Sequence, residues 1–381
     1  MQAADPHLSY DIFCTVVDNY GDIGVCWRLA RQLAARPDCG PIRLWVDNLE
    51  SFSRIASDIH PQAQRQVRQN VEVRRWVPAA VLDEEVTPAD VVIEAFACSP
   101  PASYIARMSD AQLWINLEYL SAEPWVESCH GLPSLQANGL RKHFFFPGFT
   151  ERTGGLLRER DLTTQRDAWR ADPDSRFGLL AQLGVNVEWL DRLYAGARLV
   201  YVYCYPQAPL PALMEALASA GRDTLVLIPQ GIWPGTLPGL VRTADCQVAM
   251  HAHPFVDQDI FDRLLWSSDL NVVRGEDSLI RAIWAGRPMI WQPYLQAEDA
   301  HLDKLAAWLE ISPYPSDIQN AMRAWNQGEP ERAFTELAPL LTPPRLAAWK
   351  DVAKQWSDAL LAQDDLATRL VRFCAEQSQT R

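Results

Sequence analysis

A strand that ends at a carboxylate and passes at once into a helix most constrains the fold of this chain. The apolar run Ile12–Val17 has the composition of a β-strand and ends at Asp18. Four residues later Asp22 stands between Gly21 and Gly24, which allow a close backbone approach. Apolar residues at helical spacing follow: Ile23, Cys26, Trp27, Ala30 and Leu33. Two carboxylates therefore share one strand-to-helix turn, which in an open α/β fold faces the crevice where ligands bind.

Composition limits the class of protein. A length of 381 residues is too great for one ordinary core, so two domains are expected. The net charge of −13 argues against broad nucleic-acid binding, which depends on Lys and Arg. We see neither a signal peptide nor an apolar run that could span a bilayer. The eight cysteines include no CxxC pair, so we expect reduced, buried cysteines in a cytoplasmic protein.

Strand-like runs alternate with helical stretches in both halves of the chain, which predicts two parallel sheets covered by helices. The strands expected in the first half are Ile12–Val17, Ile42–Val46, Val71–Arg74, Val91–Ala95, Leu113–Leu117 and His143–Phe146. Those expected in the second half are Leu199–Tyr203, Thr224–Ile228, Gln247–His251, Leu270–Val273 and Met289–Trp291. The fold class is therefore α/β, with two Rossmann-like domains facing a central cleft.

The segment 150–184 changes character, with adjacent glycines and many charges, and we take it as the interdomain region. We predict an N-terminal Rossmann-like acceptor-binding domain at 1–153, joined by C-terminal helices at about 351–381. A C-terminal Rossmann-like donor-binding domain is predicted at 154–350. Such a cleft suits a nucleotide-linked donor on one side and an acceptor on the other.

A second strand-to-helix turn follows the predicted strand 270–273. Gly275 makes the turn, and Glu276, Asp277 and Ser278 begin a helix. The free backbone N–H groups of a helix start can bind a diphosphate, and Ser278 can add a hydroxyl donor. We expect Glu276 to accept hydrogen bonds from sugar hydroxyls of a nucleotide. The alternative is structural, since Asp and Ser are ordinary helix caps.

Aromatic residues near this turn suggest a base-binding site. Phe255 could stack on a nucleotide base and Gln258 could read the edge of the base, or Phe255 could simply pack in the core. Tyr201, Tyr203 and Tyr205 alternate along one strand face. We expect Tyr205, together with Tyr203, to line the cleft while the upstream residue packs in the core.

The same region contains features that a metal could use. Asp257 and Asp259 spell DxD, the motif of many metal-dependent glycosyltransferases, but we expect them to begin a helix with one acid as its cap. His251 and His253 alternate on one strand face, and two histidines alone make a weak metal site. We therefore expect no metal.

Five segments that follow one another along the chain match the motifs of one family. They are Asp18–Leu33, Trp114–Ser134, Phe144–Glu159, Pro254–Trp266 and Asp269–Tyr294. Together they resemble EarP, the protein-arginine rhamnosyltransferases that modify elongation factor P. The resemblance implies a GT-B fold, meaning two Rossmann-like domains around a cleft. It also implies inverting, metal-independent transfer of L-rhamnose from dTDP-β-L-rhamnose to a guanidine nitrogen of one arginine of elongation factor P, without a cofactor.

The resemblance assigns roles to individual residues. Asp18 and Asp22 match the essential aspartates of the N-terminal motif, and Glu276 matches the essential glutamate of the donor domain. Asp277 and Ser278 match donor-phosphate contacts. The other expected donor-binding residues are Phe255 and Gln258 of the base-binding PFxxQ motif, Gly275, Tyr205, and Tyr203, where many relatives carry phenylalanine. The expected acceptor-binding residues are Asn19, Tyr20 and Gly21.

The two aspartates suit the chemistry of an arginine acceptor. Arginine is a poor nucleophile because its guanidinium stays protonated, with a pKa above ~12, and its lone pairs are delocalised. One carboxylate can hold the guanidinium bidentately while the other accepts a proton as the C–N bond forms. We assign Asp22 as the base and Asp18 as the orienting partner, although the sequence alone does not decide between them. Asp22 is expected at a helix start, whose dipole favours the carboxylate form, so we expect late proton transfer.

Other functions fit parts of the pattern. A sugar-nucleotide epimerase or a small-molecule glycosyltransferase would also use paired Rossmann-like domains, and a non-catalytic nucleotide-sugar sensor would bind without turnover. A dehydrogenase fits least, because GDIG replaces GxGxxG after the first strand. The identity of the donor sugar rests on the family resemblance, and the oligomeric state and the acceptor docking surface are not defined by the sequence.

Overall fold

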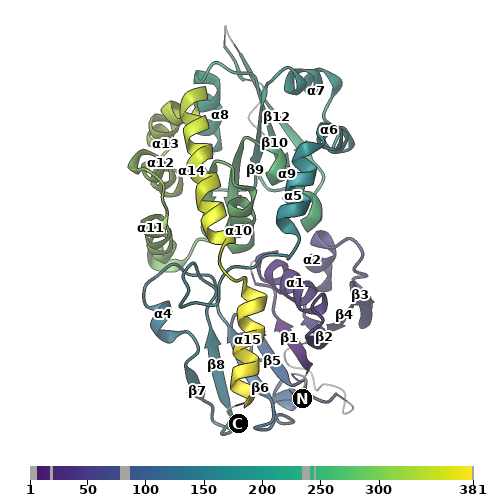
Figure 1. Cartoon of the computed structure of the whole chain (residues 1–381). Helices are drawn as coiled ribbons and strands as arrows, with labels where there is room; N and C mark the ends of the chain where they lie inside the picture. Colours follow the sequence, from purple (N-terminus) through teal and green to yellow (C-terminus); the bar gives the residue numbers. More distant parts are fainter. Residues whose placement is uncertain (1–6, 18–19, 78–85, 234–240, 244–245, 380–381) are drawn as a thin grey trace. The chain divides into compact units, whose positions relative to one another are not determined.

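The structure is a computed structural model that describes residues 7–17, 20–77, 86–233, 241–243 and 246–379 (Figure 1). The chain divides into two compact units: Met1–Arg160 with Gln363–Arg381, and Asp161–Ala362. The units therefore divide after residues 160 and 362, whereas the sequence suggested 153 and about 350. The second division lies late because α14 (Pro343–Leu361) runs unbroken through the second unit.

Within its described residues, the first unit has an eight-stranded sheet in the order β3-β4-β2-β1-β5-β6-β8-β7. The strands are β1 (Leu8–Cys14), β2 (Cys39–Val46), β3 (Arg65–Arg68), β4 (Val71–Arg75), β5 (Val91–Ala95), β6 (Leu113–Leu117), β7 (Pro133–Leu135) and β8 (Arg141–Phe145). Neighbouring strands are parallel except in the outermost pairs, β3 with β4 and β7 with β8. The predicted strand Ile12–Val17 is displaced, because β1 already ends at Cys14.

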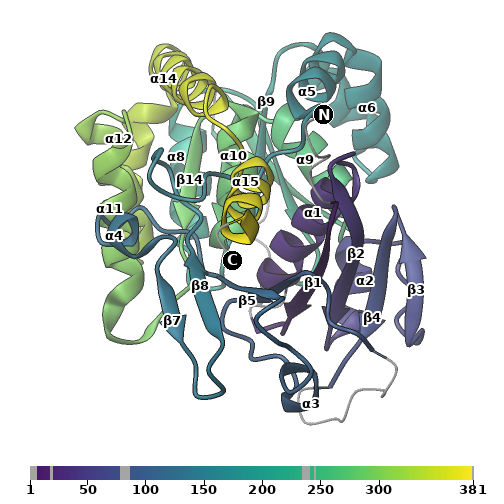
Figure 2. The ribbon, with the colours of Figure 1, turned by 60° about the horizontal axis from the view of Figure 1, so that its bottom comes forward.

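The helices of the first unit are α1 (Gly21–Ala34), α2 (Leu49–Ile55), α3 (Ala102–Ile105), α4 (Val126–Cys129) and α15 (Leu366–Gln379). The apolar face of α1 is buried against β1 and β2, and α15 packs beside α1 and over β6. Figure 2 shows these two helices side by side on the sheet. The last helix of the chain therefore completes the core of the first unit.

Within its described residues, the second unit has a six-stranded sheet in the order β11-β12-β10-β9-β13-β14. The strands are β9 (Arg198–Val202), β10 (Thr224–Pro229), β11 (Val241–Arg242), β12 (Gln247–His253), β13 (Leu270–Arg274) and β14 (Met289–Gln292). All neighbouring strands are parallel except β11 with β12. All five strands predicted for this half are present.

Helices surround this second sheet. They are α5 (Leu162–Ala171), α6 (Pro173–Gln182), α7 (Val187–Tyr194), α8 (Leu210–Ser219), α9 (Gln258–Ser267), α10 (Gly275–Ala285), α11 (Ala300–Ile311), α12 (Ser316–Gln327), α13 (Pro330–Leu337) and α14. Two 3₁₀ turns also occur, η1 (Ala297–Asp299) and η2 (Ala338–Leu341). Helix α10 is central, since it packs against β13, β14, α9 and α14. The interior contains the fully buried Trp284, Trp308, Trp325 and Trp349.

Strand order locates the ligand-binding edge of each sheet. The strands β4-β2-β1-β5-β6-β8 follow the 3-2-1-4-5-6 order of Rossmann folds, and β12-β10-β9-β13-β14 follow 3-2-1-4-5. In such sheets ligands bind beyond the carboxyl ends of the strands where the order reverses. These switch points lie between β1 and β5 in the first unit and between β9 and β13 in the second. The prediction of two Rossmann-like units is confirmed.

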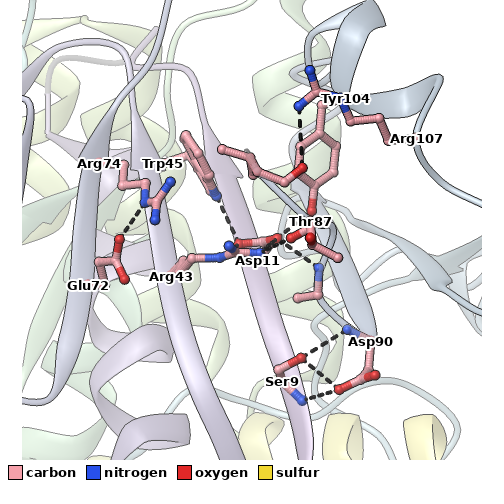
Figure 3. Close-up of polar contacts among 12 residues, drawn as sticks. Ser9, Asp11, Arg43, Trp45, Glu72, Arg74, Thr87, Asp90, Tyr104 and Arg107 are labelled. Carbon is pink, nitrogen blue, oxygen red and sulfur yellow. Dashed lines mark hydrogen bonds and ion pairs between the residues drawn. The ribbon is translucent and has the colours of Figure 1, made fainter. Parts of the chain in front are cut away.

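A buried carboxylate stabilises the centre of the first sheet (Figure 3). Asp11 on β1 is fully buried, and Arg43 of β2 binds it bidentately at 2.6 and 2.5 Å. The indole Nε1 of Trp45 donates to Asp11 at 2.9 Å and the backbone N–H of Ala89 donates at 3.0 Å. The hydroxyl of Tyr104 also donates to Asp11. The buried, hydrogen-bonded Asp11 is therefore a structural residue of the core and not a residue of the switch point.

Candidate active site

The first switch point contains Asp22 in the first turn of α1, where Tyr20 is the N-cap and Gly21 is the first helical residue. Asp22 is only 2% exposed. Its Oδ2 accepts a hydrogen bond from the backbone N–H of Val17 at 2.8 Å, and the Tyr119 hydroxyl lies 3.3 Å from its Oδ1. The carboxylate is therefore held in one orientation at the carboxyl edge of the sheet.

Two residues assigned to this turn by the sequence, Asp18 and Asn19, lie outside the described residues. The hydrogen bond from Val17 to Asp22 spans the segment that contains them. By accepting this hydrogen bond, Asp22 also links Val17 to the first turn of α1. A structural role and a chemical role are therefore compatible at this position.

The segment after β5 lies beside Asp22 and is strained. Phe96 and Ala97 have φ angles of +57° and +55°, in the left-handed region that non-glycine residues rarely adopt. The ring of Phe96 stacks on Tyr119 with centroids 4.3 Å apart. The backbone N–H of Ala97 donates to Oδ1 of Asn116 at 3.1 Å. Strained backbone of this kind is concentrated at binding and catalytic sites, which supports a functional role for this edge.

A further carboxylate at this edge was missed by the sequence analysis. Glu118 directly follows β6, and Nδ2 of Asn116 donates to it at 2.5 Å. Burial, with a further contribution from the nearby Glu94, raises the pKa of Glu118. Glu94 is itself paired with Lys142 at 2.8 Å. The available signal was the position of Glu118 immediately after a buried strand.

The second switch point contains the start of α10. Gly275 has a φ of +67° and its carbonyl accepts a hydrogen bond from Nε1 of Trp291 at 2.7 Å, so the turn requires glycine. The N-cap residue Arg274 makes no side-chain cap hydrogen bond to the helix start. Ser278, in the first turn, is 7% exposed. The local geometry is that of a backbone anion site.

A lysine that the sequence analysis missed lies at this helix start. The Nζ of Lys304 on α11 is 3.5 Å from Oε1 of Glu276, and the two side chains are 24% and 22% exposed. Asp277 is also partly exposed beside Glu276. The lysine offsets the acidic charge of Glu276 at the helix start for which the sequence predicts diphosphate binding. Because Lys304 lies on a different helix, no local motif pointed to it.

Arg274 lies between the two predicted tyrosines. Its guanidinium is 4.5 Å from the ring centroid of Tyr203 and 4.6 Å from that of Tyr205, and Nη1 donates to the Cys204 carbonyl at 3.1 Å. Tyr203 and Tyr205 are 8% and 7% exposed, whereas Tyr201 is fully buried. The upstream tyrosine therefore packs in the core, as expected, and the other two surround a cation at the carboxyl edge.

The predicted base-binding residues lie at the start of α9. Asp257 is the N-cap of this helix and accepts from the backbone N–H of Ile260 at 2.9 Å, so the DxD acid acts as a cap. Gln258 is the first helical residue and is 6% exposed. The partly exposed Phe255 lies 6.4 Å from Tyr203, centroid to centroid. Base-binding and tyrosine residues thus adjoin each other within the second unit.

One ring nitrogen of each histidine in this region faces a backbone carbonyl. His251 Nε2 lies 2.9 Å from the Leu183 oxygen and His253 Nδ1 lies 2.7 Å from the Pro254 oxygen. Among the described residues, no three His, Cys, Asp or Glu side chains are grouped so as to hold a metal ion. In the same part of the chain no helix has the length and apolar character needed to cross a membrane. All eight cysteines are free.

Two Rossmann-ordered sheets, one with an oriented carboxylate and one with a glycine-led helix start at the switch point, are the arrangement of the GT-B class of glycosyltransferases. A family model described as "Elongation-Factor P (EF-P) rhamnosyltransferase EarP" matches residues 10–375. The chain belongs to the EarP family. The resemblance drawn from the five sequence segments is confirmed, and with it the expectation of a rhamnosyltransferase.

Several relatives and solved structures match this chain over nearly their full lengths. A protein-arginine rhamnosyltransferase of Pseudomonas putida is 46% identical, covering 96% of this chain and 98% of the relative. Its counterpart in Neisseria meningitidis serogroup B is 36% identical, covering 97% and 98%. A solved structure described as the basis for EarP-mediated arginine glycosylation of elongation factor EF-P superimposes with a TM-score of 0.59 at 31% identity, covering 96% and 98%. Arabidopsis thaliana UGT89C1 complexed with UDP matches with a TM-score of 0.53 at 12% identity over 98% and 100%, which shows the fold alone.

Proposed function

We propose that this enzyme transfers L-rhamnose from dTDP-β-L-rhamnose to a guanidine nitrogen of one arginine of elongation factor P, with inversion. The family description and the solved EarP relative support this acceptor. The observation that carries the proposal is the orientation of Asp22 by Val17 and Tyr119 at the first switch point. Because this acceptor is a translation factor, the enzyme acts in the cytoplasm.

In the acceptor unit, Asp22 takes the proton that the arginine loses. The guanidine nitrogen attacks the anomeric carbon as the bond to the diphosphate breaks, and the proton on that nitrogen passes to Asp22. Asp18 holds the guanidinium as the orienting carboxylate. Asn19, Tyr20 and Gly21, which precede Asp22 in the sequence, contact the acceptor. Both oxygens of Asp22 are oriented beforehand, so little reorganisation accompanies the reaction.

In the donor unit, Phe255 stacks on thymine and Gln258 reads its edge. Glu276 binds sugar hydroxyls, while Asp277, Ser278 and the backbone after Gly275 contact the phosphates. The helix start stabilises the charge that develops on the departing diphosphate, so the transfer needs neither a metal ion nor a cofactor.

Cationic and aromatic side chains complete the donor site. Arg274, together with Tyr203 and Tyr205, bounds the site on the β9 side, and Lys304 offsets the charge of Glu276. With the acids balanced in this way, a dianionic leaving group can lie at the same helix start.

The test is the intact mass of unmodified elongation factor P after incubation with the enzyme, EDTA and dTDP-β-L-rhamnose. We expect a gain of one deoxyhexosyl unit. An elongation factor P variant with its acceptor arginine changed to lysine is the matched control and should gain nothing. No gain on the native factor, despite measurable donor binding, would overturn the assignment and favour another acceptor or a non-catalytic sensor.

A further inference from the structure

A buried ion pair joins the two helices whose first turns form the proposed donor site. Arg281 of α10 binds Asp262 of α9 through Nε at 3.0 Å and Nη2 at 2.5 Å. The two side chains are 2% and 7% exposed. None of the roles assigned to the donor site from the sequence included this pair.

The ion pair lies close to the first turns of both helices. Asp262 follows Gln258 by four residues on α9, and Arg281 follows Ser278 by three on α10. Each member therefore lies about one helical turn below a donor-binding residue, on a neighbouring part of the same helix face. The ion pair spans the contact between the helices just beneath the two first turns.

The far ends of these helices are held differently. Arg166 of α5 donates to the Trp284 carbonyl at 2.8 Å, near the end of α10. Arg170 donates to the Ala285 carbonyl and, at 3.4 Å, to the Trp266 carbonyl of α9. Helix α5 thus links the carboxyl ends of α9 and α10, whereas Asp262 and Arg281 link the helices at mid-length, in the turn that follows each first turn.

Energetics favour a positioning role over simple stabilisation. Transferring a carboxylate and a guanidinium from water into a protein interior is costly, and a well-packed apolar pair is often equally stabilising. A bidentate pair adds a fixed plane and a fixed separation, which apolar contacts do not specify. What the ion pair contributes, and an apolar pair would not, is therefore a fixed position of α9 relative to α10.

That placement matters because one small ligand must reach both helix starts. A nucleoside diphosphate has a limited span between its base and its phosphates, and binding sites need their groups placed within about 0.5 Å. We propose that Asp262 and Arg281 are positioning residues that set the spacing between the base-binding start of α9 and the diphosphate-binding start of α10. This inference rests on the proposed dTDP-linked donor.

The test compares ligands that bridge the two helix starts with ligands that do not. Calorimetry would give the affinity of the wild type and of Asp262→Asn and Arg281→Lys for dTDP. Ligand-observed NMR would give the affinities for thymidine and for pyrophosphate. We expect dTDP affinity to fall between about tenfold and a hundredfold, since a misplacement near one ångström has this effect. Affinities for the two fragments should change by less than about threefold.

Kinetics supply the second readout. The KM for the donor should rise in parallel with the loss of dTDP affinity, while the KM for elongation factor P stays within about twofold of the wild-type value. Arg281→Lys keeps the charge and serves if Asp262→Asn does not fold. Asp223→Asn is the matched control, since it removes a 2.6 Å ion pair with Arg192 elsewhere in the unit and should leave dTDP affinity unchanged.

The outcomes separate this inference from the proposed function. If a variant unfolds at a lower temperature but binds dTDP like the wild type, the pair only stabilises the fold and the inference is wrong. Equal losses for thymidine and dTDP would also contradict it. If the wild type binds dTDP but transfers nothing to elongation factor P, only the acceptor assignment fails. A wild type that does not bind dTDP would overturn both.

Discussion

The hydroxyl of Tyr119 lies 3.3 Å from Oδ1 of Asp22, so the loop after β6 holds the carboxylate at the start of α1. The ring of Tyr119 is itself fixed by its stack on Phe96. Phe96 directly follows β5, and Tyr119 is the second residue after β6 of the same sheet. The proposed base is therefore oriented by the edge of the sheet as well as by its own helix.

Tyr119→Phe removes this hydroxyl while keeping the stacked ring. We expect kcat to fall between about tenfold and a hundredfold, because a hydrogen bond to a charged group contributes about 1.5–3 kcal/mol. The donor KM should stay unchanged, since the donor binds in the other unit. Tyr194→Phe, at an 82% exposed position on α7, is the control. An unchanged kcat in Tyr119→Phe would show that the hydroxyl does not orient Asp22.

Lys304→Met tests the cation beside Glu276. We expect the donor KM to rise about threefold to fivefold, because a partly exposed ion pair contributes about 0.5–1 kcal/mol. The difference from the wild type should shrink at high salt, where the charges are screened. Lys354→Met removes an exposed ion pair with Asp358 and should have no effect on the donor KM. A salt-independent change would indicate lost packing instead.

Asp11→Asn tests the buried network of the first unit. Asp11 is fully buried and Arg43 is partly buried, so removing the charge of Asp11 from this pair should lower the free energy of unfolding by about 3 kcal/mol. Thermal and urea denaturation would measure this loss, and kcat well below the transition should stay near the wild-type value. Asp90→Asn is the matched control, because its carboxylate accepts from Ser9 at an exposed site (Figure 3). Equal destabilisation by both changes would contradict the assigned role of Asp11.

The buried His253 should make stability depend on pH. Burial lowers the pKa of His253 from 6.5 to about 4, and the nearby His251 contributes, although the Pro254 carbonyl partly opposes the shift. The unfolded chain then binds the proton more readily than the folded one. The stabilising contribution is complete above pH 6.5 and is lost as the pH falls towards 4.

At pH 5 the loss from His253 should be about 2 kcal/mol. Urea denaturation of the wild type and of His253→Gln at pH 7.5 and pH 5 would measure it. The variant should lose less stability than the wild type over this interval. An identical pH dependence in the two proteins would show that His253 does not titrate as its burial requires.

Much of the fold could be predicted from the sequence because the central strands are short apolar runs between helical patterns. The predicted β5 and β6 have the observed bounds, Val91–Ala95 and Leu113–Leu117. The edge strands β3 and β7 were missed, since they are short and largely exposed. The prediction started this strand at Ile12 because the polar Asp11 interrupts the apolar pattern, whereas β1 begins at Leu8. The residues that bind Asp11, Arg43 and Tyr104, come from distant parts of the chain.

Residues of the candidate site could be predicted only where they lie together in one short segment of the sequence. The turns at Asp22 and at Gly275 each combine a strand end, glycine and acidic residues within a few positions. Lys304 was missed because its ion-pair partner Glu276 lies on another helix, and Glu118 was missed because the Glu94 charge that raises its pKa lies on another strand. Charge pairing between elements depends on how they pack, which local periodicity does not encode.

The central claim is that Asp22 accepts the proton from the acceptor arginine, and Asp22→Asn tests it most directly. The measurement is the intact mass of elongation factor P over time with the variant and dTDP-β-L-rhamnose, alongside calorimetric donor binding. We predict that transfer falls by at least about a hundredfold, the usual contribution of a positioned base, while donor affinity stays near the wild-type value. Transfer within about tenfold of the wild-type rate, with donor affinity unchanged, would contradict the role of Asp22 as the base.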